Sequence, residues 1–589
     1  MRIFSNQPSV PILLLMFLPF FGFSAQAEKI SDQSFLKYNS PFMEVLKTES
    51  PFLHEERPVY PVWSRILNVD FFKYQPEVER DGEGECQSQN WLDKNRATPS
   101  SYQPTDVIRD SSLQRNRIFD SISQYLMKCD QKIQLGWSFP LVSTYRTVML
   151  QLPINAHPYG RVVLFHLPKG NLVKGFLALK GDNIKRPLII MRLGVFATAT
   201  TFLPERFMFM QLFEQSPFNV LVLESNSNRE SIFRNRNLSI GGFDEGIQNF
   251  EIAKQLQDPG EPIAKIIESV NLSSISMGGH GALYAALLSD LDLKKRSSGV
   301  LKKTASPELE PVIRSVLAYC PLINFRDTMD YHLAQSVQSV GFNYWVGNRL
   351  RGINQVISGI DEDHFVESLL TWVDKNYQGP VAYSESLPLN DNMKAQLKNF
   401  WSENQFWSSY RNVQTPVLIL ATESDPVVPF PINSGRIQSK YMDLGDSQIK
   451  VVTLQAGLHC SLPGAYFWRP MTSLAQAYFL RQSEFKTESL QRSIDLTREE
   501  ASGMKAKKFP PSYQLQEGKN GEDFFLNLEI SELPKTIKSV SFTLNEMGFA
   551  ESNFLDSKEM IQRWLKQNLR FELNESSAQN PRLVLRWDR

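Results

Sequence analysis

Six short apolar runs, separated by segments of helical spacing, constrain the fold of this chain more than any other feature. The runs occupy residues 186–194, 219–225, 270–276, 312–320, 415–424 and 449–457. Continuous apolar strands that alternate with helices are typical of a mostly parallel sheet with helices on both faces. The sequence therefore predicts an α/β fold.

Other apolar runs precede this series and differ from it in how they are connected. RVVLFHLP at 161–168 and LVKGFLALKG at 172–181 are joined by the turn Lys169-Gly170-Asn171, and TYRTVMLQLPI lies before them at 144–154. So short a link favours antiparallel strands. We expect these runs to form the antiparallel start of the sheet.

The connection between the fourth and fifth of the six runs, residues 321–414, is too long for a simple crossover. It contains segments of helical spacing such as DEDHFVESLLTWVDKNY at 361–377. An insertion of this length carries its own structure, and above a parallel sheet it lies over the carboxyl ends of the strands, where ligands bind. We therefore expect a helical lid over about 322–412.

The N-terminus reads as a secretory signal. Arg2 is followed by an apolar block at 12–23 and by the small residues of SAQA at 24–27, so cleavage is expected after Ala27. The apolar block is shorter than the ~20 residues needed to span a bilayer, and no other stretch is long and apolar enough. The sequence thus predicts export to the periplasm or the extracellular space, without a stable membrane span.

Changes in composition divide the rest of the chain into three parts. Residues 28–143, rich in Pro, Tyr and acidic side chains, are expected to wrap a larger body as an N-terminal extension with one amphipathic helix at 112–129. The α/β domain takes up 144–484. After a charged linker, the remaining residues, 485–589, predict a small α+β accessory domain.

Charge and cysteine content limit the partners to be expected. The 63 basic and 63 acidic residues cancel, which gives no electrostatic reason to expect nucleic acid or an anionic membrane as a partner. None of the four cysteines has metal-site spacing, and no metal or organic cofactor is expected. An oxidising compartment permits a bridge between Cys86 and Cys129, but the sequence does not fix the connectivity, and unpaired buried thiols are the alternative for all four, including Cys320 and Cys460.

The third of the six runs ends in a pattern that predicts a nucleophile. In VNLSSISMGGHG at 270–281, an apolar strand passes through a turn into a helix, the context that a G-x-S-x-G elbow requires. Aligned on that template, Ser276 is the nucleophile, with the small residues Ser274 and Gly278 two positions away on either side. Ser274 as the nucleophile would place Leu272 where only a small side chain fits. An ordinary strand-to-helix turn is the alternative.

A serine nucleophile needs a histidine base and an acid, and in this kind of fold they follow the serine in the order acid, then histidine. His459, directly after the last apolar run, is the only histidine beyond residue 415. Asp425 lies in the loop after the run 415–424, where Glu423 is its nearest competitor. The sequence therefore predicts a Ser276, Asp425, His459 triad.

The remaining histidines are expected to have other roles. His280, about one helical turn after Ser276, is expected to pack or hydrogen-bond beneath the elbow rather than act as the base. His332 and His364 lie in the lid, where solvated or capping roles are the expectation.

An acyl-transfer enzyme also needs hydrogen-bond donors for the oxyanion. One is expected to be the backbone N–H of Met277, the residue after the nucleophile, and the other to come from the loop after the run 186–194. Val195 is the expected donor in that loop, and Phe196 is the alternative. Arg192, just before the loop, is expected to form a structural ion pair, with a contact to a substrate carboxylate as the other possibility.

Taken together, the strands and the three triad residues resemble the α/β-hydrolase superfamily over residues 144–484. SMGGHGAL at 276–283 is similar to the elbow of esterase D and S-formylglutathione hydrolase relatives, and SDPVVP at 424–429 to the acid loop of many esterases and serine peptidases. The chain departs from these relatives at Ser274, where glycine is usual, and at Leu193-Gly194, where many carry His-Gly. The resemblance implies acyl-group hydrolysis through a serine acyl-enzyme, without metal or organic cofactor.

The sequence thus predicts an exported serine hydrolase of the esterase or lipase kind that cleaves a carboxylic ester in a small molecule. A serine peptidase of the same fold, of the prolyl-oligopeptidase kind, is the alternative within enzymes. A non-catalytic binding protein that kept the fold is the alternative outside them. Substrate identity and oligomeric state are not indicated by the sequence.

Overall fold

A computed structural model describes most of the expected α/β domain, together with separate elements on either side of it. The described residues are 40–46, 112–129, 160–180, 185–198, 208–214, 216–300, 310–334, 344–376 except 345, 362 and 363, 388–389, 399–406, 413–441, 448–454, 459, 468–485 except 482 and 484, 489–495, 498–505, 512–517, 524–529, 540–543, 569–574 and 581–588. The expected signal segment at 1–27, the run at 144–154 and most of the expected extension lie outside these residues.

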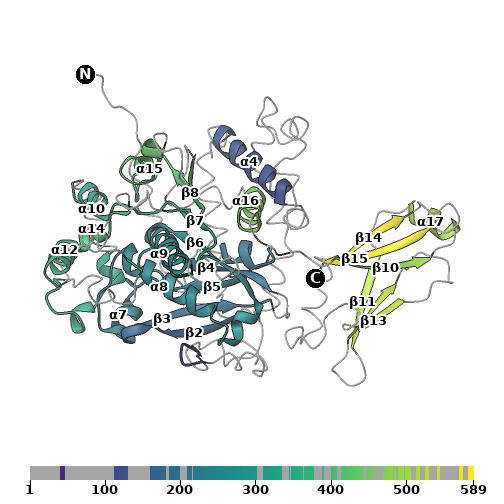
Figure 1. Cartoon of the computed structure of the whole chain (residues 1–589), viewed down its shortest axis with the longest axis horizontal. Helices are drawn as coiled ribbons and strands as arrows, with labels where there is room; N and C mark the ends of the chain where they lie inside the picture. Colours follow the sequence, from purple (N-terminus) through teal and green to yellow (C-terminus); the bar gives the residue numbers. More distant parts are fainter. Residues whose placement is uncertain are drawn as a thin grey trace.

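A nine-stranded sheet in the order β1-β2-β3-β5-β4-β6-β7-β8-β9 forms the centre of the fold (Figure 1). Its strands are β1 Met43–Val45, β2 Gly160–His166, β3 Leu172–Ala178, β4 Arg186–Arg192, β5 Asn219–Leu223, β6 Ile267–Ile275, β7 Val316–Tyr319, β8 Val417–Thr422 and β9 Ile449–Leu454. The pairs from β1 through β2 and β3 to β5 are antiparallel, and all pairs from β5 through β4 to β9 are parallel. The predicted α/β fold with a mostly parallel sheet is therefore confirmed.

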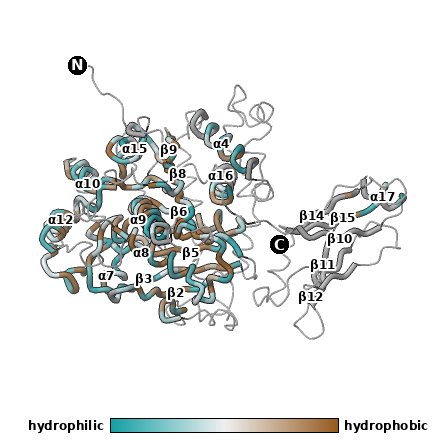
Figure 2. Tube along the Cα trace, in the orientation of Figure 1, coloured by the Kyte–Doolittle hydropathy of each residue, from teal (hydrophilic) through white to brown (hydrophobic). Residues whose placement is uncertain are grey.

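Burial along the strands explains why they read as continuous apolar runs. Every residue is buried in β4, β5, β7 and β8. In the edge strand β9, half-buried residues at 450, 451 and 453 alternate with buried ones. Strands buried on both faces gain from an apolar side chain at each position, while an edge strand does not. Figure 2 traces the apolar residues through these central strands.

Helices cover both faces of the sheet. On one face α8 Gly242–Leu256 packs on the long helix α9 Ser276–Val300, and their apolar side chains form one core cluster with alternate residues of the strands. The second face carries α4 Ser112–Cys129 and α16 Trp468–Leu480. α4, the helix expected in the N-terminal extension, is tied to α16 by a hydrogen bond from Arg115 Nη1 to the Leu480 carbonyl at 2.9 Å.

The insertion between β7 and β8 contains helices, as expected for the lid. They are α10 Phe325–Leu333, η10 Ile353–Gln355, α12 Phe365–Asn376 and α14 Phe400–Glu403. Their apolar side chains form a third core cluster, which also takes in Phe196 and Met277. The lid, the loop after β4 and the start of α9 therefore share one apolar core.

Two small antiparallel sheets follow in the C-terminal part, as expected for an α+β unit. One has the order β10-β15-β14 and the other β11-β12-β13, with a helix between β10 and β11. Their bounds are β10 Ser489–Asp495, α17 Arg498–Lys505, β11 Ser512–Glu517, β12 Phe524–Glu529, β13 Val540–Thr543, β14 Leu569–Asn574 and β15 Arg582–Asp588. The predicted domain boundaries themselves stay predictions.

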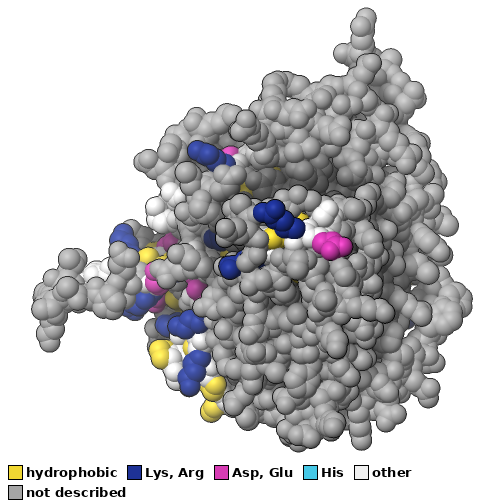
Figure 3. Space-filling model, turned by 90° about the vertical axis from the view of Figure 1, so that its right-hand side faces the viewer, with side chains coloured by type: hydrophobic (Ala, Val, Ile, Leu, Met, Phe, Trp, Pro, Cys, Tyr) yellow, Lys and Arg dark blue, Asp and Glu magenta, His cyan; other side chains and the backbone are white. Residues whose placement is uncertain are grey.

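Charge and hydropathy of the described residues give two further facts. Basic and acidic side chains both occur on the face drawn in Figure 3, as the balanced composition leads one to expect. Among the helices that the structure describes, none is both long and apolar enough to cross a membrane.

Candidate active site

Ser276 stands at the junction of β6 and α9, at the carboxyl end of the sheet. Its φ of 54° lies in the left-handed region, which non-glycine residues seldom adopt. Such a turn holds the side chain out from the end of the strand, and the cost of the conformation is typical of functional sites. The strand, turn and helix predicted around this serine are thus all present.

Close approach to the end of β4 explains Gly278 in the elbow. A Cβ on Gly278 would lie 2.4 Å from the Leu193 carbonyl oxygen and 2.5 Å from that of Arg192. At Gly194, by contrast, a Cβ would lie 3.5 Å from the Ser276 Cβ, which is an ordinary van der Waals distance. The backbone at the end of the neighbouring strand therefore requires a glycine at position 278.

Ser274, at the position where esterase relatives usually have glycine, has a role in the sheet. Its buried Oγ accepts a hydrogen bond from the backbone N–H of Arg192 at 3.2 Å. Arg192 is the last residue of β4 and lies opposite Ser274 in the parallel pairing of β4 and β6. The hydroxyl therefore links β6, which ends next to Ser276, to β4, which leads into the loop of Val195.

The structure brings Ser276, His459 and Asp425 into one hydrogen-bonded row. His459 Nε2 lies 3.2 Å from Ser276 Oγ, and its Nδ1 lies 2.9 Å from Asp425 Oδ2 and 3.1 Å from Oδ1. The Asp425 side chain is buried and its Oδ1 also accepts the backbone N–H groups of Val427 and Val428 at 2.8 and 2.9 Å. A carboxylate accepts from Nδ1–H, and in that tautomer Nε2 is the ring nitrogen that can accept a proton.

The other candidates for the acid and the base, Glu423 and His280, lie in different surroundings. Glu423, the nearest alternative acid, is exposed at the end of β8, whereas Asp425 is buried against the histidine. His280 is fully buried, and among the described residues neither of its ring nitrogens has a hydrogen-bond partner. Burial lowers the pKa of His280 to about 3, and its ring packs on Tyr284 with centroids 5.1 Å apart. His280 is thus a neutral packing residue.

Of the two lid histidines, one differs from expectation. His364 is exposed beside Asp361, but His332 is mostly buried and its Nε2 donates to the Val427 carbonyl oxygen at 2.7 Å. Burial lowers the pKa of His332, and this hydrogen bond opposes the shift. The expected solvated or capping role was wrong for His332, which ties lid helix α10 to the loop that carries Asp425.

The loop after β4 supplies the candidate oxyanion donors. Phe196, in the left-handed region at φ 62°, donates its backbone N–H to Ser227 Oγ at 2.9 Å. The Ala197 N–H donates to the Gly194 carbonyl oxygen at 3.2 Å. With these two amides engaged, Val195 is the better candidate donor of this loop. Met277 lies in the first turn of α9, whose N-terminal amides favour negative charge.

Arg192, the last residue of β4, is fully buried. Its guanidinium is paired with Glu245 at 3.6 Å and donates to Asn226 Oδ1 at 2.9 Å and Gln248 Oε1 at 2.7 Å. Burial lowers the pKa of Arg192 and raises that of Glu245, and each charge opposes the shift of the other. This geometry fits the expected structural ion pair of Arg192 and does not fit the alternative, a direct contact with a substrate carboxylate.

A disulfide-bonded cysteine lies beside Asp425 and His459. Cys320, the buried residue after β7, is disulfide-bonded. The alternative of an unpaired thiol is thus wrong for Cys320. Its sulfur and ligand atoms of Asp425 and His459 lie within 4.8 Å of one another. A metal site here would need a thiolate, and a disulfide sulfur does not provide one.

The strand order, the helices on both faces and the elbow after β6 define the α/β-hydrolase fold. No protein-family model matches the sequence, and no curated protein matches it. Among solved structures, a Pyrococcus horikoshii acylaminoacyl peptidase is similar at 12% identity and a TM-score of 0.34, over 56% of this chain and 42% of that one. A puromycin-hydrolyzing peptidase from Mycobacterium tuberculosis matches at 16% identity and a TM-score of 0.31, over 57% and 41%.

Esterases occur among the similar structures as well. Acetyl xylan esterase 1 from Thermoanaerobacterium sp. JW/SL YS485 matches at 12% identity and a TM-score of 0.32, over 54% of this chain and 83% of that one. The chain spans about two fifths of the length of the two peptidases. At these TM-scores, the assignment of the fold rests on the strand order and the elbow.

Proposed function

We propose that this protein is a serine hydrolase that cleaves a carboxylic ester in a small molecule, with Ser276, His459 and Asp425 as its catalytic triad. One observation carries the proposal: a serine on a strained elbow lies 3.2 Å from Nε2 of a histidine whose Nδ1 is bonded to a buried carboxylate. Each element of that row has a role in acyl transfer.

In the first half-reaction, His459 Nε2 takes the proton of Ser276 as Oγ attacks the ester carbonyl. The carbonyl oxygen becomes an oxyanion, which accepts hydrogen bonds from the amides of Met277 and Val195. Asp425 stabilises the protonated histidine. When the tetrahedral intermediate collapses, the C–O bond to the alcohol breaks and His459 gives its proton to the leaving oxygen, which leaves an acyl-enzyme.

In the second half-reaction, His459 deprotonates a water molecule that attacks the acyl carbonyl. The second tetrahedral intermediate collapses with loss of Ser276 Oγ, which takes the proton back from the histidine. The products are an alcohol and a carboxylic acid, and the enzyme returns to its starting state. No metal or organic cofactor enters these steps.

A fluorophosphonate probe tests the proposal, because it is attacked only by an activated serine. We expect the wild-type protein to be labelled on the peptide that contains Ser276, and Ser276→Ala to remain unlabelled. Failure to label the wild type, or equal labelling of the variant, would refute the proposed serine hydrolase activity and favour a non-catalytic binding protein. Nitrophenyl esters of increasing chain length, tested beside aminoacyl amides, then separate an esterase from a peptidase.

We also propose that the chain is exported, with cleavage after Ala27. The disulfide at Cys320 supports this proposal, because structural disulfides form and persist in oxidising compartments. N-terminal sequencing of the protein recovered from the periplasm or the medium tests it, and a mature chain that begins at Glu28 is expected. Recovery of the intact chain from the cytoplasm alone would contradict it.

A further inference from the structure

The loop that follows β5, residues Glu224–Asn228, contacts the loop that follows β4 at two points. Ser227 Oγ accepts the Phe196 N–H at 2.9 Å, and the Ser225 N–H donates to the Ala197 carbonyl oxygen at 2.9 Å. Both contacts fall immediately after Val195. The loop after β5 thus fixes the backbone on one side of the candidate oxyanion donor.

A chain of hydrogen bonds sets the direction in which Ser227 acts. Ser225 Oγ donates its single proton to Glu245 Oε1 at 2.8 Å, and Ser225 Oγ and Ser227 Oγ lie 2.8 Å apart. Because the Ser225 proton is already engaged, the Ser227 hydroxyl donates to Ser225 and keeps its lone pairs for the Phe196 N–H. The carboxylate of Glu245 therefore determines that Ser227 Oγ turns a lone pair, and not its proton, toward the Phe196 N–H.

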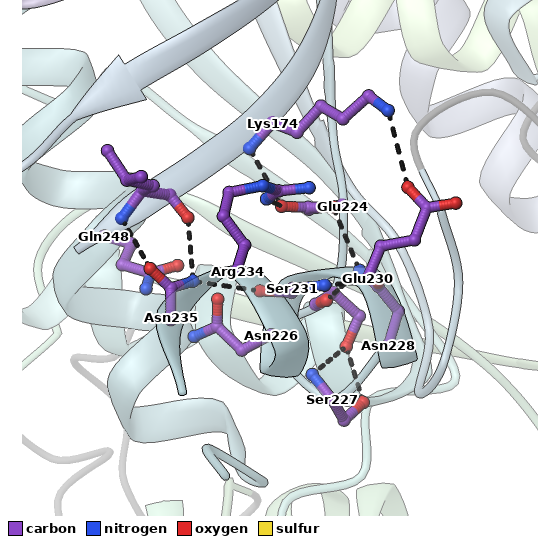
Figure 4. A network of polar contacts seen from close by, with 12 residues as sticks. Lys174, Glu224, Asn226, Ser227, Asn228, Glu230, Ser231, Arg234, Asn235 and Gln248 are labelled. Atoms are coloured by element: carbon purple, nitrogen blue, oxygen red, sulfur yellow. Dashed lines mark hydrogen bonds and ion pairs between the residues drawn. The ribbon is translucent and has the colours of Figure 1, made fainter. Parts of the chain in front are cut away.

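The other side of the loop is anchored to β3 and to α7 Arg229–Asn235 (Figure 4). Glu224, which is buried, accepts hydrogen bonds from the Lys174 N–H at 2.9 Å and Asn228 Nδ2 at 3.1 Å, and it pairs with Arg234. Asn228 Oδ1 in turn accepts from the Ser231 N–H at 2.9 Å and so caps α7. Two buried glutamates, one on each side, hold this short loop in place.

We infer that Ser227 is a positioning residue for the oxyanion loop: it holds the Phe196 amide, so that the Val195 amide is the one presented to the reacting carbonyl. Phe196 has a left-handed backbone, which costs energy for a bulky residue. The hydrogen bond from its N–H to a buried hydroxyl offsets that cost. This inference rests on the proposed function, because an oxyanion donor matters only for acyl transfer.

Ser227→Ala tests the inference, with Ser231→Ala as the matched control. Ser231 belongs to the same polar network, but its hydroxyl accepts from Asn235 Nδ2 at 3.3 Å rather than from the loop after β4. We expect Ser227→Ala to lower kcat about tenfold or more, with little change in KM. The loss should not exceed the ~10²–10³-fold loss that follows direct removal of an oxyanion donor. Ser231→Ala is expected to keep the wild-type kcat.

A transition-state analogue separates positioning from general damage. A trifluoromethyl ketone forms a tetrahedral oxyanion on Ser276, so its inhibition constant should rise in Ser227→Ala by the same factor as kcat/KM falls. Equal kcat in the two alanine variants, or a loss of kcat without weaker ketone inhibition, would overturn the inference. If Ser227→Ala does not fold, Ser227→Cys replaces it, because a thiol is a weaker acceptor of the same shape.

The wild-type protein distinguishes failure of the inference about Ser227 from failure of the proposed function. Labelling and turnover by the wild type support the proposed function whatever the Ser227 variants do. A wild type that is neither labelled nor active refutes the proposed function and the inference together.

Discussion

Acidification tests the account of His280 most directly. The ring is fully buried without a hydrogen-bond partner among the described residues, and burial lowers its pKa to about 3. In the unfolded chain the same histidine titrates near ~6.5. Between these two values the unfolded state binds a proton that the folded state does not, so the free energy of unfolding must fall as the pH falls.

The size of this effect follows from the two pKa values. From pH 7 to pH 5, protonation of an unfolded histidine with a pKa of ~6.5 stabilises the unfolded state by about 2 kcal/mol. The folded state contributes almost nothing over that range, because pH 5 lies well above about 3. One residue is thus expected to remove about 2 kcal/mol of stability on mild acidification.

Urea unfolding at pH 7 and pH 5 measures the effect, with His280→Leu as the comparison. Leucine has a similar volume and no titrating group, so it keeps the packing against Tyr284 while removing the linkage. Other titrating groups contribute equally to both proteins and cancel in the difference. We expect the wild type to lose about 2 kcal/mol more than the variant. Equal losses in the two proteins would show that His280 is protonated in the folded state and that its burial has been misjudged.

Three further predictions concern the active site and its surroundings. Asp425→Asn should lower kcat by about 10⁴-fold while the fold is retained, measured on a nitrophenyl ester, because the amide no longer selects the histidine tautomer. Ser274→Ala should lower the free energy of unfolding by about 1–3 kcal/mol in urea, because the buried N–H of Arg192 loses its acceptor, and an unchanged stability would contradict that role. Cys320 should be found joined to Cys460 by peptide mapping of the unreduced protein, because Cys460 follows the histidine that lies beside the Cys320 sulfur, and a different partner would contradict the assignment.

Much of the central sheet could be predicted from the sequence because burial leaves a local record. A parallel strand with helices on both faces is apolar at each position, and the six runs correspond to β4 through β9. Edge strand β1 was not predicted, because it is only three residues long: Met43 and Val45 are apolar and buried against the core, but so short an alternation is too weak a signal to indicate a strand.

The expected triad residues could be chosen because chain order and scarcity act together. Few histidines are present, and a single one follows the last strand of the sheet, so His459 was the only candidate for the base at that position. Asp425 was preferred to Glu423 on its place in the loop, and the structure adds the reason that only Asp425 is buried against the histidine. The assignment of chemical roles to these residues is still a prediction.

The supporting contacts could not be predicted, because each depends on a partner far along the chain. Ser274 contacts Arg192, 82 residues away, and Ser227 contacts Phe196, 31 residues away. A serine in a loop also has too many ordinary uses for its type to indicate such a partner. The one local signal was the cluster of small polar residues at 225–228, directly at the end of an apolar run, as at the end of the run that carries the elbow.

The polar groups buried around Arg192 contribute more to the geometry of the candidate site than to the stability of the fold. A buried ion pair such as Arg192–Glu245 gains little stability over apolar residues of the same volume, because both charges lose their water. Here the pair lies where three chain segments meet: Ser274 bonds the Arg192 backbone, Gln248 the guanidinium, and Ser225 the carboxylate. An apolar core could fill that space but could not fix the direction of a hydroxyl or of a backbone N–H. The position of an oxyanion donor requires such directional contacts, so we expect this cluster to matter more for turnover than for stability.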